Sequence, residues 1–194
     1  INQNTNYNLE LLNSIGSNFI FQEKPINRLK NKPQNLKNQS NVEETDKEKQ
    51  LVLLKEQINL VENCSLKANS SKVVLGDGNI NSPIMLIGET PGVMEDKTGL
   101  TFMSDSGALL KKMLSAINIK KENIYCTYAI NFRPPEDRKP TTIEIKRYSQ
   151  FLQQHISIIR PKIIILVGST AMESLTGLNS NISIERGKWK EVIV

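Results

Sequence analysis

The sequence contains few of the residues that build disulfide frameworks and metal centres. It has two cysteines and one histidine among 194 residues. Cys64 and Cys126 are too few for a disulfide framework, and neither has a cysteine or histidine neighbour at the spacing of metal ligands. We therefore predict two reduced, buried thiols.

Long apolar runs are missing as well. No run approaches the ~20 apolar residues that a membrane helix needs. The opening INQNTNYNLELLN has neither the basic segment nor the apolar core of a signal peptide, and it begins with Ile rather than Met, which suggests a fragment. We expect a soluble, cytoplasmic protein with no membrane partner.

A glycine-rich phosphate loop is the third absence. The segment GETPGVMED contains neither G-x-G-x-x-G nor G-x-x-x-x-G-K-S/T, which argues against a nucleotide-binding enzyme of the common α/β types. The net charge of +5 is compatible with a polyanionic partner. It is equally compatible with biased composition, because the lysines are scattered along a chain rich in Asn and Ile.

Charge and apolar patterning divide the chain near residue 49. Residues 25–49 are polar, carry blocks of charge and lack apolar periodicity, so they should not order themselves. Before them, LELLNSIGSNFIF is compatible with a short docking helix. We predict a low-complexity N-terminal extension and linker over residues 1–49 and a folded domain over 50–194.

Helical patterns and buried strands alternate through this domain. An amphipathic helix is predicted from residue 48, and a capping box at Thr141 and Glu144 opens a later one. Strands are predicted within 71–80, 84–88, 123–131 and 162–168, and further helices within 106–117, 142–159 and 169–177. The alternation predicts a three-layer α/β/α fold with a central, mostly parallel four-stranded sheet, preceded by a partly disordered N-terminal extension.

The loop over residues 88–107, GETPGVMEDKTGLTFMSDSG, carries the most chemistry. It leaves a buried strand and enters a helix, so its N–H groups can face an anionic or carbonyl-bearing ligand. Glu89 stands at the strand tip, where a carboxylate can orient a water or stabilise positive charge on a sugar. Phe102 offers an aromatic face to a base. A solvated or helix-capping carboxylate and a core aromatic are the alternatives for these two residues.

Five motifs occur in continuous order within residues 72–194. They are G-E-T-P-G-x-x-E-D, G-x-x-F-x-x-x-S-G-x-L-L-x-x-M-L, R-P-P-x-x-R-x-P-T, P-K-I-I-I-L-V-G-S-T-A and R-G-K-W. Together they resemble the family-4 uracil-DNA glycosylases, especially their alphaproteobacterial branch. The resemblance implies a monomeric base excision repair enzyme that binds single- or double-stranded DNA and hydrolyses the N-glycosidic bond of a flipped-out uracil.

The resemblance also implies roles for individual residues. Glu89 would be the catalytic acid that activates water or stabilises an oxocarbenium-like sugar. Substrate-binding positions would be Gly88, Thr90, Phe102 and Tyr128. Contacts to the DNA backbone would come from Arg133, Arg138 and Lys139. Arg186 and Trp189 match the R-G-x-W motif, and we interpret Trp189 as a packing residue.

The cluster positions depart from the family pattern. Typical members hold a 4Fe-4S cluster on four cysteines. Only Cys64 is kept here, and Val61, Phe132 and Tyr148 stand at the other three positions. We predict no metal and no cofactor, with the bulky replacements filling the space that a cluster takes.

Two further departures concern the site itself. Typical members place at Tyr128 an Asn that reads the carbonyl and NH of uracil. With Tyr there, the pocket accepts another base, holds uracil differently or has lost activity. The family's closing His-Pro motif would follow the strand that KEVIV begins, but the sequence stops at Val194, so the resemblance is to a C-terminally truncated member.

His155 is no substitute for the histidine of that motif. It lies on the predicted 142–159 helix, and we interpret it as a core or surface residue rather than a ligand. These departures leave a second hypothesis open beside the glycosylase: a catalytically impaired, DNA-binding relative without glycosylase activity.

Overall fold

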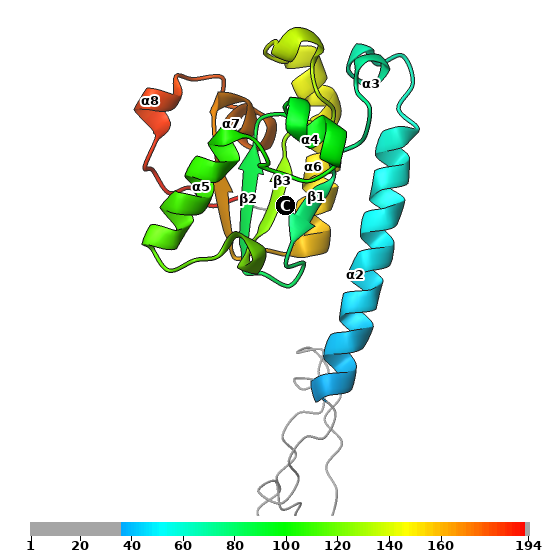
Figure 1. Ribbon diagram of the computed structural model, residues 1–194, viewed down its shortest axis with the longest axis vertical. Helices are drawn as coiled ribbons and strands as arrows, with labels where there is room; N and C mark the ends of the chain where they lie inside the picture. The colour runs from blue at the N-terminus through cyan, green and yellow to red at the C-terminus, as the bar shows by residue number, and fades with distance from the viewer. Residues whose placement is uncertain (1–35, 193–194) are drawn as a thin grey trace, which may run out of the picture. The chain divides into compact units, whose positions relative to one another are not determined.

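The computed structural model describes residues 36–192, and Figure 1 shows their arrangement. The docking helix predicted within residues 9–21 and most of the predicted linker lie outside the described residues. The contacts within the chain group its residues into two compact units, the second of which begins at Asn38. The helices and strands of this second unit form the fold. No helix of the described part is long and apolar enough to cross a membrane.

The helix predicted from residue 48 is observed as the later part of α2 (Leu36–Asn59). α2 begins at Leu36, inside the stretch that we predicted as linker, and runs on without a break. The part of α2 before Leu51 is rich in Glu, Lys and Gln, and these residues favour a helix even where it has no apolar face. The Gln50 side chain also donates a hydrogen bond to Asp46, four residues earlier, at 2.8 Å.

The sheet has four strands, as predicted. They are β1 (Gly76–Gly78), β2 (Ile84–Gly88), β3 (Tyr125–Tyr128) and β4 (Ile163–Leu166). Their order is β1-β3-β2-β4; β2 pairs in parallel with β3 and β4, and the short β1 pairs antiparallel with β3 (Figure 1). The predicted mostly parallel sheet is therefore confirmed.

The other helices lie before, between and after the strands along the chain. They are α3 (Ser65–Asn69), α4 (Val93–Thr98), α5 (Asp105–Ala116), α6 (Thr142–Ile159), α7 (Ser169–Thr176) and α8 (Ile182–Glu185), with the 3-10 turns η1 (Lys121–Asn123) and η2 (Pro135–Asp137). α6 begins at the predicted capping box: Thr141 Oγ1 accepts the Glu144 N–H, and the Glu144 carboxylate accepts the Thr141 N–H. Pro161 lies just beyond its end.

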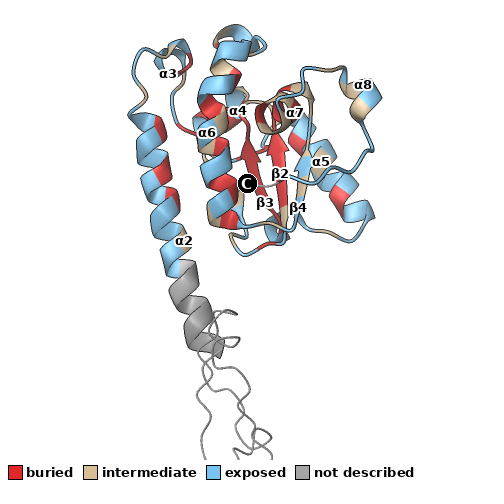
Figure 2. Cartoon of the chain, turned by 180° about the vertical axis from the view of Figure 1, so that it is seen from behind, coloured by how far each residue is buried: buried red, intermediate tan, exposed pale blue. Residues whose placement is uncertain are grey.

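Apolar side chains pack on both faces of the sheet, which gives the predicted three layers. On one face, Leu51 of α2, Ile156 of α6 and Ala171 of α7 pack with residues of β2 and β3. On the other, Leu114 of α5 packs with Phe102 and a second set of strand residues. β2 and β3 are covered by these layers and buried along nearly their whole length (Figure 2).

Candidate functional site

The carboxyl ends of β2, β3 and β4 meet at one edge of the sheet because these strands are parallel. Three connections leave this edge, and they contain the polar loops predicted at 88–107, 131–140 and 168–170. Gly88 at the end of β2 is in register with Tyr128 at the end of β3. The fold thus brings together the segments from which the sequence predicted a site.

Glu89 is half-buried and held by the start of α7. Its Oε1 atom accepts the Thr170 N–H at 3.0 Å and the Ser169 hydroxyl at 3.4 Å. The positive end of a helix favours a carboxylate at this place. Gly168, with a φ of +100°, leaves the room: a Cβ there would lie 2.5 Å from Glu89 Oε1. Glu89 therefore caps α7, and its carboxylate is fixed at the strand tip. Thr90, the next residue, is also half-buried.

Glu95 organises the 88–107 loop, a role that the sequence did not predict. It is 2% exposed, and its carboxylate accepts the N–H groups of Gly92 at 3.1 Å, Met103 at 2.8 Å and Ser104 at 3.0 Å. Burial by itself raises the pKa of Glu95, but the hydrogen bonds outweigh it and the pKa is lowered. One carboxylate thus joins the start of α4 to the start of α5.

Asp96 ties α4 to the neighbouring loops. Its Oδ1 atom accepts the Ser70 hydroxyl at 2.5 Å and the Ser71 N–H at 2.8 Å. The same Ser70 hydroxyl accepts the Arg133 N–H at 3.2 Å. The loop after β3 is therefore connected to the loop after β2 through a buried carboxylate and a serine.

Asp77 of β1 holds the other end of the loop, next to Phe102. Its carboxylate accepts both the N–H of Thr101, at 2.5 Å, and the Thr101 hydroxyl, at 2.9 Å. The Lys121 ammonium bridges Asp77, at 3.1 Å, and the Thr101 carbonyl, at 2.6 Å. Because these contacts join residues 20 to 44 positions apart, no local pattern predicts them.

Three of the predicted substrate-binding residues lie in mutual contact. The rings of Phe102 and Tyr128 have their centroids 5.0 Å apart, and the Phe102 N–H donates to the Tyr128 hydroxyl at 2.9 Å. A Cβ added to Gly88 would lie 2.8 Å from the Tyr128 ring and 2.9 Å from the Phe102 ring. Phe102 belongs to the core, as the alternative held, and it also faces the site loops.

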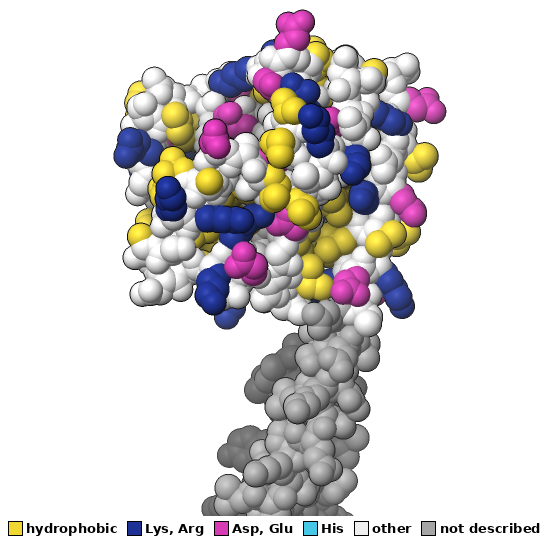
Figure 3. All heavy atoms as spheres, in the orientation of Figure 1, with side chains coloured by type: hydrophobic (Ala, Val, Ile, Leu, Met, Phe, Trp, Pro, Cys, Tyr) yellow, Lys and Arg dark blue, Asp and Glu magenta, His cyan; other side chains and the backbone are white. Residues whose placement is uncertain are grey.

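The basic residues predicted to contact DNA lie together after β3, but two of them have carboxylate partners. Arg133 binds Asp137 through two nitrogens at 2.7 and 2.9 Å, and Arg138 binds Glu144 in the same way. The hydrogen bonds from Arg138 lower the pKa of Glu144 to about 2. Lys139 is exposed. On the face seen in Figure 3, Lys and Arg are interspersed with Asp and Glu rather than gathered in one patch.

Three of the four cluster positions of the family, Val61, Phe132 and Tyr148, carry no thiol. Tyr148 is fully buried; its hydroxyl lies 3.3 Å from Cys64 Sγ, and its ring meets Phe132 edge-on with centroids 6.1 Å apart. Both rings belong to one apolar cluster, against which Cys64 packs. Within residues 45–192, no three His, Cys, Asp or Glu side chains gather as metal ligands would. One thiol cannot replace the four that a 4Fe-4S cluster requires.

Other predicted residues have mixed outcomes. Cys126 is buried, and burial raises the pKa of its thiol to about 12, whereas Cys64 is only half-buried, so the prediction of two buried thiols is wrong for Cys64. His155 is a core residue as interpreted, with Nε2 2.9 Å from the Tyr125 hydroxyl. The packing interpretation of Trp189 is wrong for the described residues: its side chain is 84% exposed, because it follows α8 in a segment without regular structure.

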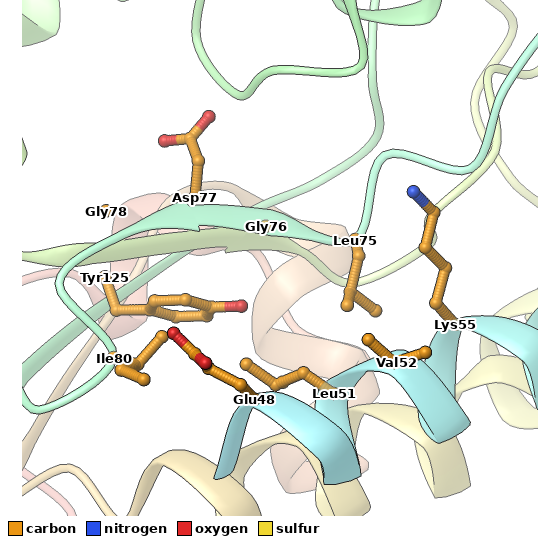
Figure 4. A pocket seen from close by; sticks show the side chains of 10 residues that line it. All are labelled: Glu48, Leu51, Val52, Lys55, Leu75, Gly76, Asp77, Gly78, Ile80 and Tyr125. Atoms are coloured by element: carbon orange, nitrogen blue, oxygen red, sulfur yellow. The ribbon is translucent and has the colours of Figure 1, made fainter. Parts of the chain in front are cut away.

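Two hollows in the described residues lie away from the site loops. One, of about 310 Å³, lies between α2 and β1, where Leu51, Leu75, Ile80 and Tyr125 present apolar surface to it (Figure 4). The other, of about 270 Å³, lies between α2 and α6. Tyr125 and Phe102 belong to different apolar clusters, on opposite faces of the sheet. Neither hollow is lined by Glu89, Phe102 or Tyr128, so neither extends the candidate site.

The fold and its loops define a class of α/β protein that presents a fixed carboxylate and an aromatic pair at the carboxyl edge of a parallel sheet. A family model described as "Uracil DNA glycosylase superfamily" matches residues 75–194, more than half of the chain. The chain belongs to the uracil DNA glycosylase superfamily.

Individual relatives agree with this assignment. A type-4 uracil-DNA glycosylase of Thermotoga maritima is 36% identical over 126 residues, which are 65% of this chain and 66% of the relative. That of Archaeoglobus fulgidus is 34% identical over 66% of this chain and 67% of its own length. That of Sulfurisphaera tokodaii is 35% identical over 73% and 70%. The chain thus spans about two thirds of the length of these relatives.

Proposed function

We propose that this chain is a uracil-DNA glycosylase of base excision repair, acting as a monomer in the cytoplasm. It hydrolyses the N-glycosidic bond of a flipped-out uracil in DNA. The similarity to type-4 uracil-DNA glycosylases at 34–36% identity supports this activity. The observation that carries it is Glu89, a carboxylate held by α7 at the sheet edge where Phe102 also lies.

The fixed carboxylate suits the charge that this reaction develops. When the bond between C1′ and the base nitrogen breaks, its electron pair leaves with the base and the sugar becomes cationic. A water then adds to C1′ and loses a proton. The two hydrogen bonds to Glu89 Oε1 fix the direction of the carboxylate, so that Oε2 can face the cation or accept the proton of the water.

Phosphate contacts are assigned to the loop after β3. Arg133, Arg138 and Lys139 lie at or near the protein surface there. Both guanidinium groups lie at the surface, where a phosphate can replace the carboxylate partner. The exchange should cost less for Arg133, whose partner Asp137 is exposed, than for Arg138, whose partner Glu144 is mostly buried. These three residues position DNA without reading its sequence.

The test is single-turnover excision from a uracil-containing single-stranded oligonucleotide. We expect excision by the 194-residue chain, and a loss of about 10²-fold in Glu89→Gln, because the amide cannot accept a proton or neutralise a cation. Glu122→Gln, an exposed carboxylate on η1, is the matched control and should retain the full rate. The Thermotoga maritima enzyme is the positive control of the assay. Equal rates for wild type and Glu89→Gln would contradict the role assigned to Glu89.

A second function, a catalytically impaired DNA-binding relative, is favoured by one observation. Tyr128 fills the space beside Phe102. Such a relative binds the oligonucleotide in a salt-sensitive way, since phosphate contacts release counterions. It removes no base of any kind. The same assay therefore separates the two functions, because binding and excision are measured on one substrate.

We also propose that the chain holds no 4Fe-4S cluster. The support is the packing of Phe132 and Tyr148 at two ligand positions and the single thiol of Cys64. After anaerobic reconstitution with iron and sulfide, beside a ferredoxin as positive control, we expect well below one iron per chain. Cys64→Ser should melt within a few degrees of wild type. About four irons per chain, lost in Cys64→Ser, would refute the proposal.

A further inference from the structure

Tyr128 occupies the part of the site where the proposed function requires a base. We propose that its phenol is an intramolecular mimic of the substrate base, which closes the site until Tyr128 is displaced. Tyr128 is then the residue that determines which bases enter. This inference rests on the proposed function, since it takes Phe102 as the surface on which the base stacks.

The ring of Tyr128 covers the ring of Phe102. Their centroids are 5.0 Å apart and their planes are inclined by 35°, a geometry of favourable aromatic pairs. Phe102 is 8% exposed and Tyr128 is 4% exposed. Because Phe102 has so little open surface, a base cannot stack on it while Tyr128 stays in place.

The hydroxyl of Tyr128 also takes the place of a ligand atom. It accepts the Phe102 N–H at 2.9 Å in a buried position. A pyrimidine carbonyl oxygen is an acceptor of the same kind. A buried N–H without an acceptor is costly, so this donor needs either Tyr128 or a ligand.

The backbone conformation of the loop fixes the position of the Phe102 N–H. Phe102 has a φ of +52°, a left-handed conformation that is costly for a bulky residue. Its carbonyl lies against Gly107 of α5, where an added Cβ would meet it at 1.8 Å. Only glycine at position 107 permits this arrangement. Strained backbone of this sort gathers at ligand-binding sites.

Gly88 provides the room in which both rings lie. Gly88 and Tyr128 are register partners on β2 and β3, and a Cβ at Gly88 would clash with both rings. Glu89, the next residue, turns instead toward α7 and is half-buried. The catalytic carboxylate is therefore in place while the adjacent base position is filled.

If Tyr128 closes the site, its variants should differ in the contacts that they leave open to free uracil. Tyr128→Ala removes the ring and leaves the Phe102 N–H without its acceptor, so free uracil can supply both contacts. Tyr128→Phe keeps the ring and removes only the hydroxyl. Tyr148→Phe, the same atomic change at a fully buried position in another cluster, is the matched control.

The first measurement is the binding of free uracil by isothermal titration calorimetry, with folding checked by circular dichroism. We expect Tyr128→Ala to bind at least about tenfold more tightly than wild type, a difference of about 1.4 kcal/mol. Tyr128→Phe should lie between them, and Tyr148→Phe should match wild type. Equal affinity in wild type and Tyr128→Ala overturns the inference.

A second measurement uses the wild-type chain, so it does not depend on whether the Tyr128→Ala variant folds. With fluorotyrosine in the wild-type chain, the Tyr128 signal, assigned from Tyr128→Phe, should shift when a uracil-containing oligonucleotide binds. An oligonucleotide with thymine in its place should leave the signal unshifted. No shift at saturating uracil DNA overturns the displacement of Tyr128.

The two proposals fail in different ways. Suppose that Tyr128→Ala binds free uracil tightly, and yet neither the wild type nor Tyr128→Ala excises uracil from DNA. The proposed hydrolysis is then wrong, and the base mimic stands. If Glu89→Gln abolishes excision while Tyr128→Ala changes neither binding nor rate, the glycosylase stands and the mimic is wrong.

Discussion

We expect the replacement of Glu95 by alanine to lower the free energy of unfolding by about 4 kcal/mol. Three N–H groups, those of Gly92, Met103 and Ser104, lose a charged acceptor that is 2% exposed. Each buried donor left without a partner costs about 1–3 kcal/mol, and partial access of water to the loop offsets some of the sum. Urea unfolding at neutral pH measures the loss.

Two variants separate the hydrogen bonds of Glu95 from its charge and position. Glu95→Gln keeps one carbonyl acceptor but turns an NH₂ group toward backbone donors, so we expect a loss of about half as much. Glu122→Ala removes an exposed carboxylate on η1 and should change stability by less than about 0.5 kcal/mol. A loss below about 1 kcal/mol in Glu95→Ala would show that the loop does not depend on this carboxylate.

The Glu95 contacts also set the position of the proposed base-stacking ring. Met103 and Ser104 directly follow Phe102, and Asp77 holds Thr101 immediately before it. Phe102 thus lies between two carboxylate anchors, one from α4 and one from β1. The left-handed backbone of Phe102 is tolerated because its neighbours on both sides are fixed.

The fold followed from local patterns that survive in the structure. The apolar run at 84–88 became β2 because a central parallel strand is buried on both faces. The Thr141 and Glu144 capping box began α6 at the expected residue. The start of α2 was misplaced because the first turns of this helix are polar and give no periodic apolar signal.

The contacts that organise the site could not be predicted in this way. Glu95 and Asp96 appear in the sequence as two acidic residues in a first helical turn, a common pattern with a simple electrostatic reason. Their buried hydrogen bonds reach Met103, Ser104 and Ser70, on other segments. Only the folded loop brings these partners within bonding distance.

Aromatic side chains fill the space at two places where the sequence departs from the family pattern. At the cluster positions, Tyr148 and Phe132 pack edge to face beside Cys64. At the proposed base position, Tyr128 packs on Phe102. In both places the ring is buried, and the tyrosine hydroxyl has a polar neighbour. Buried rings therefore take up space at both departures, where an empty cavity would cost stability.

We expect the unfolding free energy to fall on mild acidification because of His155. It is 2% exposed, its ring nitrogens face the hydroxyls of Tyr125 and Thr127, and burial lowers its pKa to about 3. The unfolded chain takes up this proton near the ordinary pKa of 6.5. From pH 7 the loss should reach about 1 kcal/mol at about pH 5.5 and should go on growing as the pH falls toward 4.5.

The carboxylates lose their contributions to stability at lower pH than His155 does, so the effect of His155 can be measured separately. The pKa values of Glu95, Asp96 and Glu144 lie below their ordinary values of 4.5, 3.8 and 4.5, so their contributions are present above those values and are lost only as the pH falls further. Urea unfolding between about pH 7 and 5.5 therefore reports His155. His155→Gln retains an amide that can bond the Tyr125 hydroxyl and should be less stable at pH 7 but nearly independent of pH in this range. Parallel curves for the two proteins would mean that His155 takes up its proton in the folded state with the same pKa as in the unfolded chain, which its burial between two uncharged hydroxyls opposes.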